Sequence, residues 1–295
     1  MVCRVLAMLV LSAVLPATAQ GVRPLAMTPG GEMAARVDGE KCADRVRLTF
    51  LAKSAESFKT SDPAAGRLMN NVTQLLRQQC PILARVNVRG VAQEKLAYSG
   101  LAEAATGWGV VELGTTGSGL LAGRDSSART GPAARDLFSR GANFLPFARF
   151  VDFTKTAPLL CIRPDASGAT CAGVNEYSVQ GDGSVRIISS YLLDNTGTTA
   201  VLTYPSRNKA GFFCANPSEA QVSVSGGKAT AAGRADMQEM LLERVRAAGA
   251  EICLGHIGDG PQNLSTESFD ADGHSLGQRS ASKLVAQRPA LRLDK

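Results

Sequence analysis

Aromatic residues are scarce in this chain of 295 residues, which narrows the partners it can have. Only 5% of the residues are aromatic, with a single tryptophan, Trp108, and four tyrosines. Nucleic-acid surfaces interleave basic residues with several stacking rings, and carbohydrate clefts commonly use more than one tryptophan. We therefore expect no nucleic-acid partner, and one tryptophan makes a poor carbohydrate-stacking cleft.

Histidines are equally few, and this limits metal and cofactor chemistry. His256 and His274 are the only two, and cysteines committed to disulfides cannot ligate a metal. Asp270 and Asp272 resemble the start of a calcium loop, but the ligand positions beyond Gly273 are not acidic. No G-x-G-x-x-G opens a predicted helix. We expect neither a metal site nor a cofactor site.

Long apolar runs are also missing, and no segment approaches the roughly 20 apolar residues that a transmembrane helix needs. A shorter apolar segment, Val5–Leu15, follows Arg4 and precedes the Ala-Thr-Ala sequence that ends at Ala19. This is the arrangement of a secretory signal peptide. We expect residues 1–19 to be removed after Ala19 and the mature protein, which begins at Gln20, to be periplasmic or secreted without transmembrane insertion.

Cysteines form an even set once the leader, with Cys3, is removed. The remaining six enter a compartment where thiols oxidise: Cys42, Cys80, Cys161, Cys171, Cys214 and Cys253. Proximity along the chain favours Cys42–Cys80 and Cys161–Cys171, and Cys214–Cys253 then follows by elimination. We interpret all six cysteines as structural.

Composition divides the mature chain into two units. Residues 114–141 are rich in Gly, Ser, Thr and Arg and show little apolar periodicity, which is typical of a linker. We therefore predict a mobile lead-in over residues 20–41, a first unit over 42–113 and a second unit over 142–295.

The first unit combines strand and helix patterns. Asp62 and Pro63 are suited to start a helix whose apolar stripe stops at Cys80. An antiparallel meander under this helix is expected from alternating polar and apolar residues over Arg45–Phe50, Ile82–Ala92, Leu96–Leu101 and Trp108–Leu113. A helix over Glu94–Ala105 is an alternative for part of this region.

The second unit is richer in strand signals. One helix is expected over about Arg234–Ala248, with Gly249 as its stop, and one hairpin around Asp270–Gly273. Further strands are expected over Glu176–Val179, Val185–Leu193, Ala200–Tyr204 and Gln221–Ser225. The predicted fold class is α+β, with two small disulfide-linked units that each pack an antiparallel sheet with about one helix.

The segment Gly273–Gly277 carries the best match to a catalytic motif. It fits G-x-S-x-G and resembles the nucleophile elbow of lipases and other α/β-hydrolases, which would make Ser275 a nucleophile. In that family a buried strand precedes the serine and the histidine follows it, whereas polar residues precede Ser275 and no histidine follows His274. We interpret Ser275 as a turn hydroxyl on the surface, and expect Ser275→Ala to change stability by less than about 0.5 kcal/mol.

Charge gives the remaining indication of function. The formal net charge is +6, and Arg4 leaves with the signal peptide, so anionic envelope components are the expected partners if the charge is more than a solubility device. Asp236, Glu239 and Glu243 share a helix face, which is typical of solvated charges. No catalytic residue is assigned. The sequence favours a non-enzymatic binding or scaffolding protein of the cell envelope, with an exported hydrolase that uses dispersed carboxylates as the alternative.

Overall fold

Two β-structures and three α-helices make up most of the described part of the chain. The computed structural model describes residues 26–27, 33–40, 42–54, 58, 63–108, 110–113, 144–209, 211–247, 251–271 and 274–293. The helices are α1 (Pro63–Gln79), α3 (Phe147–Thr154) and α4 (Ala231–Ala247), and short 3-10 turns occur at η2 (Ala104–Thr106) and η4 (Pro217–Glu219). No helix that the structure describes has the length and apolar character needed to cross a membrane. The predicted signal peptide, 1–19, and linker, 114–141, lie outside the described residues.

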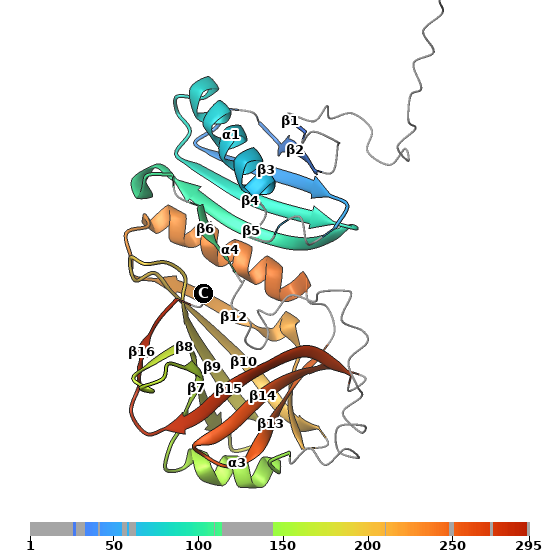
Figure 1. Ribbon diagram of the computed structural model, residues 1–295, viewed down its shortest axis with the longest axis vertical. Coiled ribbons are helices and arrows are strands. Elements are labelled where there is room, and N and C mark those ends of the chain that lie inside the picture. Colours follow the sequence, from blue (N-terminus) through green and yellow to red (C-terminus); the bar gives the residue numbers. More distant parts are fainter. Residues whose placement is uncertain are drawn as a thin grey trace, which may run out of the picture.

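The first sheet has six strands in chain order (Figure 1). They are β1 (Ala26–Met27), β2 (Met33–Asp38), β3 (Arg45–Ala52), β4 (Arg85–Ala92), β5 (Lys95–Glu103) and β6 (Val110–Glu112). Two of these strands, β1 and β2, come from the segment that the sequence assigns to the lead-in. The sheet is mixed, because α1 crosses between β3 and β4 and returns the chain parallel to β3, while the other pairs are antiparallel. The expected purely antiparallel meander is therefore wrong.

The β4–β5 connection decides between the two predictions for the region after Ala92. Gln93 and Glu94 both have positive φ, at 49° and 64°. A two-residue connection with two positive φ values is the turn type that matches the twist of a hairpin. Strand β5 follows directly, so the alternative helix over Glu94–Ala105 is not formed.

Helices cover both faces of this sheet (Figure 1). On one face Val86 and Val88 of β4 join Val72 and Leu76 of α1 in a buried cluster. Strand residues alternate between the faces, so the side chains of Arg85, Asn87 and Arg89 point to the other face. That face is covered by α4, which belongs to the second half of the chain.

The second half forms a closed antiparallel barrel of eight strands below α4 (Figure 1). The strands are β7 (Leu159–Pro164), β8 (Thr170–Val179), β9 (Val185–Leu192), β10 (Thr199–Lys209), β11 (Phe212–Ala215), β13 (Ile252–Gly260), β14 (Asn263–Asp270) and β15 (Ser275–Val285). Two further strands attach to it: β12 (Gln221–Ser225) pairs with β10, and β16 (Ala290–Leu291) pairs parallel to β8. Helix α3 lies at the end of the barrel away from α4 (Figure 1).

Closure of the barrel overturns the predicted fold class of two small α+β units. Strand β10 pairs with β12 over Thr199–Thr203 and with β11 over Arg207–Lys209. The pairing with β11 closes the barrel, and the pairing with β12 extends the sheet toward α4. Barrel closure also requires β15 to pair with β7, from which it is distant in sequence. Alternation along one strand indicates which face is buried and carries no information about its partner. The chain is therefore mostly β, with a barrel and a separate sheet.

Charged residues hold α4 against the first sheet. The two carboxylate oxygens of Asp236 accept hydrogen bonds from Arg45 Nη1 at 2.7 Å and from Arg85 Nε at 2.9 Å. Farther along the helix Glu243 pairs with Arg89, and Glu239 pairs with Arg45. The interpretation of these carboxylates as solvated helix charges is therefore wrong for Asp236, whose side chain is only 6% exposed. Glu239 and Glu243 are more exposed, at 53% and 38%, although both pair with arginines of the sheet.

The start of α4 is fixed by a residue of the first sheet. Glu103, at the end of β5, is 3% exposed, and its carboxylate accepts hydrogen bonds from the backbone N–H and the hydroxyl of Thr230. The Thr230 hydroxyl in turn accepts from the Gly233 N–H, as a helix N-cap does. A Cβ at Gly233 would lie 2.4 Å from Glu103 Oε2, so glycine leaves the space for this carboxylate. A negative charge is favoured at this end of a helix.

The six cysteines pair as the sequence predicts. Sulfur atoms lie 1.92 to 2.05 Å apart in Cys42–Cys80, Cys161–Cys171 and Cys214–Cys253. The first disulfide joins the end of α1 to the loop before β3, and the other two join barrel strands. Each cross-link therefore stays within one half of the chain.

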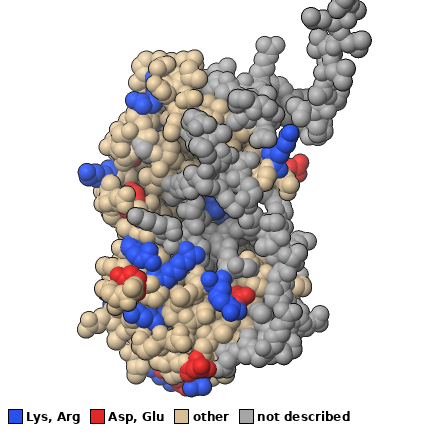
Figure 2. Space-filling view, in the orientation of Figure 1, with Lys and Arg blue, Asp and Glu red and all other residues tan. Residues whose placement is uncertain are grey.

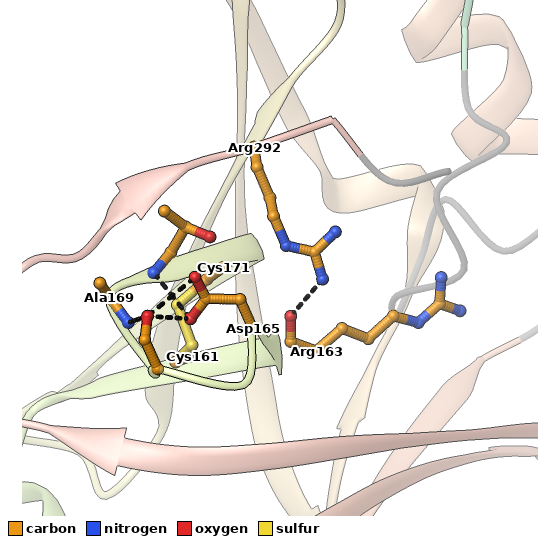
Figure 3. Close-up of a disulfide and its surroundings, with 8 residues drawn as sticks. Cys161, Arg163, Asp165, Ala169, Cys171 and Arg292 are labelled. Atoms are coloured by element: carbon orange, nitrogen blue, oxygen red, sulfur yellow. Dashed lines mark hydrogen bonds between the residues drawn. A yellow bond between two sulfur atoms is a disulfide. The ribbon is translucent and has the colours of Figure 1, made fainter.

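Figure 3 shows how the second disulfide closes a loop beside the C-terminal segment. Asp165, inside this loop, accepts hydrogen bonds from residues of the same loop. Arg292 donates to the backbone oxygen of Arg163 at 2.8 Å, next to the parallel pairing of β16 with β8. The cross-link and this arginine together tie the end of the chain to the barrel.

The α4 interface predicts a specific loss of stability. Asp236→Asn should lower the free energy of unfolding by about 2 to 4 kcal/mol, because it leaves two arginines without their shared buried carboxylate. Glu239→Gln is the matched control on the same helix. Glu239 is 53% exposed, so its loss should cost no more than about 1 kcal/mol. Urea denaturation followed by circular dichroism measures both, and equal effects would contradict this account of the interface.

Candidate functional site

Ser275, the serine of the elbow-like motif, lies at the start of a strand. It is 2% exposed, so its interpretation as a surface turn hydroxyl is wrong. Its hydroxyl donates to Glu267 Oε1 at 2.5 Å, and Glu267 Oε2 accepts from Arg279 Nε at 2.7 Å. The predicted hairpin around Asp270–Gly273 joins β14 to β15, although Asp272 and Gly273 lie outside the described residues. A nucleophile elbow needs a helix after the serine, and here β15 follows.

His256 lies inside the barrel, on β13. Its ring stacks on Phe150 of α3 with centroids 4.0 Å apart, and its Nδ1 is 3.1 Å from the hydroxyl oxygen of Thr266. Its Nε2 is 3.5 Å from the Tyr177 hydroxyl. Burial lowers the pKa of His256 to about 3, so the ring is neutral at physiological pH. This histidine packs the interior of the barrel and fixes α3 against it.

The structure does not bring Ser275 and His256 together. Thr266, which contacts His256, and Glu267, which binds Ser275, are neighbours on β14. Successive residues of a strand point to opposite faces of the sheet. The serine hydroxyl and the histidine ring therefore lie on opposite sides of the barrel wall and cannot act as nucleophile and base.

One group of metal-ligand residue types comes together among the described residues, and it consists of Cys214, Glu251 and Cys253. The two cysteines form a disulfide and have no thiolate to offer. Glu251 pairs with Lys209 at 2.7 Å. Asp270, the first residue of the calcium-like sequence, accepts a hydrogen bond from the backbone N–H of His274. Each of these four side chains therefore has a partner within the protein.

A hollow on the first unit is a candidate ligand site among the residues that the structure describes. It has a volume of about 330 Å³, opens to solvent, and lies between the end of α1 and the loop after η2. Its lining residues are Gln74, Arg77, Gln78, Cys80, Pro81, Leu83 and Trp108. Cys80 and Leu83 are buried and form an apolar base, while the longer polar side chains come from α1. Ligand sites commonly combine an apolar surface with a few polar groups of this kind.

Trp108, which lines this hollow, has an unusual backbone conformation. Its φ is 67°, directly after Gly107 with φ of 76°. A bulky residue with positive φ is strained, typically by about 1 to 3 kcal/mol, and such strain is common at functional sites. The backbone N–H of Trp108 donates to the backbone oxygen of Glu103, and the Arg77 guanidinium lies 4.8 Å from the centre of the ring. These contacts hold the indole at the edge of the hollow.

Sequence reasoning missed this site because it treated the single tryptophan as too few. Trp108 and Arg77 are distant in sequence, and only the crossover of α1 brings them together. The available signal was a large aromatic residue directly after Gly107, where the chain turns between two predicted strands.

Comparison with models of protein families, with curated proteins and with solved structures found no match.

The contacts of Ser275 change the effect expected for its removal. Ser275→Ala should cost about 1 to 2 kcal/mol, because it removes a buried donor to the Glu267 carboxylate. Ser167→Ala is a control, since the Ser167 hydroxyl also binds a carboxylate, that of Asp165, but is exposed. We expect the control to change stability by less than about 0.5 kcal/mol. A fluorophosphonate probe should not label Ser275; labelling that is lost in Ser275→Ala would show a reactive serine and refute its structural role.

The buried His256 predicts a dependence of stability on pH. The unfolded chain binds a proton at this residue below about pH 6.5, whereas the folded protein does so only near pH 3. Its contribution is therefore fully present above pH 6.5 and is lost as pH falls toward 3, by at most about 1.4 kcal/mol per pH unit. His256→Gln should flatten the stability curve between pH 6 and 4, measured by urea denaturation. An unchanged slope in His256→Gln would contradict the prediction.

Proposed function

We propose that the chain is an exported, non-enzymatic binding protein of the cell envelope, and that it binds through the hollow at Trp108. The observation that carries this proposal is the combination of an open hollow with a strained tryptophan, one arginine and two glutamines at its edge. The side chains of Gln74 and Gln78 have no hydrogen-bond partner among the described residues, so a ligand can recruit their amides without breaking an existing bond.

The disulfides support the exported setting of this proposal. Three cross-links are expected in an oxidising compartment and are rare in a reducing cytoplasm. The positive formal charge supports an anionic partner. Figure 2 agrees with this sign, since Lys and Arg side chains predominate across the middle of the visible face.

Export and binding are tested together in cells and with purified protein. Expression with the leader in a bacterial host should give a mature N-terminus at Gln20, and the purified protein should sediment with isolated envelope. Trp108→Ala should lose sedimentation, whereas Val179→Ala, at a barrel residue that is 51% exposed, should retain it. Retention of the leader in the cytoplasm, or equal sedimentation of both variants, would overturn the proposal.

A further inference from the structure

We infer that the hollow at Trp108 binds an acidic saccharide, a pyranose ring that carries a carboxylate. This inference rests on the proposed binding function and adds the chemical class of the ligand. It is argued from the charge of the hollow, its aromatic wall, its size and its rigidity.

The charge of the hollow selects an anion. Arg77 is the one formally charged residue among the described residues that line it. This arginine forms no ion pair with any residue that the structure describes, unlike Arg45, Arg85 and Arg89 on the opposite face of the sheet. A guanidinium binds a carboxylate through two parallel hydrogen bonds. Because the hollow adjoins the C-terminal end of α1, where the helix dipole is negative, an anion depends on Arg77 for its attraction.

The aromatic wall and the amides select a sugar ring. The Arg77 guanidinium lies over the Trp108 ring, 4.8 Å from its centre, and a carboxylate would draw it off the ring. The indole then offers a flat apolar surface with a donor at one edge, which suits the C–H face of a pyranose that also presents hydroxyls. The amides of Gln74 and Gln78 each offer donors and an acceptor, which match sugar hydroxyls. The apolar base at Cys80 and Leu83 excludes water from one side of such a ring.

The size and rigidity of the hollow limit the ligand to one or two rings. Its volume of about 330 Å³ is at the lower end of the range of about 300 to 1,000 Å³ for small-molecule sites. Its opening to solvent leaves room for a polysaccharide to continue beyond it. The Cys42–Cys80 disulfide fixes the end of α1 beside the hollow, so little backbone ordering is needed on binding.

Fluorescence tests the inference directly, because Trp108 is the only tryptophan in the protein. The oxidised mature protein is titrated with galacturonate, with galactose as a ring without a carboxylate, and with acetate as a carboxylate without a ring. We expect a saturable change in tryptophan emission with galacturonate, and binding at least about tenfold weaker with galactose and with acetate. Calorimetry of the same titrations measures binding independently of the emission.

Two arginine variants separate the site from general charge. Arg77→Gln should weaken galacturonate binding by at least about tenfold and leave galactose binding unchanged. Arg149→Gln removes the same charge from another arginine that lies over an aromatic ring, 5.6 Å from the centre of Phe153 on α3, and should bind as the unmodified protein does. Circular dichroism checks that both variants are folded.

Several results would overturn the inference. They are the absence of saturable binding of galacturonate, equal binding of galacturonate and galactose, and equal losses in the two arginine variants. Envelope sedimentation that depends on Trp108 but is not inhibited by galacturonate would refute the acidic saccharide and leave the proposed binding function intact.

Discussion

The ion pairs between α4 and the first sheet are the interaction on which the rest of the structure depends. Each carboxylate oxygen of Asp236 accepts a hydrogen bond from one arginine, and the Glu103 carboxylate accepts one from the backbone N–H of Thr230 at the start of the helix. Beside these charges Leu101 of the sheet packs in one cluster with Met237 and with residues of the barrel. The barrel and the sheet therefore share α4, and neither half can release it without exposing buried charge and apolar surface.

This arrangement gives the two faces of the first sheet different roles. One face, with the arginines of β3 and β4, is used to hold α4 and the barrel. The other is covered by α1, whose last turn forms the hollow with Trp108. A ligand at the hollow therefore does not compete with the ion pairs, and the barrel with its filled interior acts as a stable support. His256 contributes to that support by stacking on Phe150.

Sequence patterns predicted the local features well and the long-range ones poorly. The helix after Pro63 and the hairpin at Asp270 follow from neighbouring residues, which report local conformation. The cysteine pairing follows from proximity along the chain and, for Cys214–Cys253, from elimination. Barrel closure depends on β10 changing partners and on β15 reaching β7, and no residue pattern records a partner distant in sequence. The β4–β5 turn was not recognised because it lacks the usual Asn-Gly or Gly residues. Gln93 and Glu94 adopt the positive φ values of this turn instead. At the site, the sequence shows Trp108 as a single tryptophan but does not indicate that Arg77 is its neighbour in the fold.

A crystal structure of the oxidised mature protein grown with galacturonate is the most direct test of the binding role assigned to the hollow. The account predicts a sugar ring against the Trp108 indole, with its carboxylate paired to Arg77 and its hydroxyls within hydrogen-bond distance of Gln74 or Gln78. An empty hollow beside a ligand bound elsewhere, or a ring whose carboxylate points away from Arg77, would contradict it.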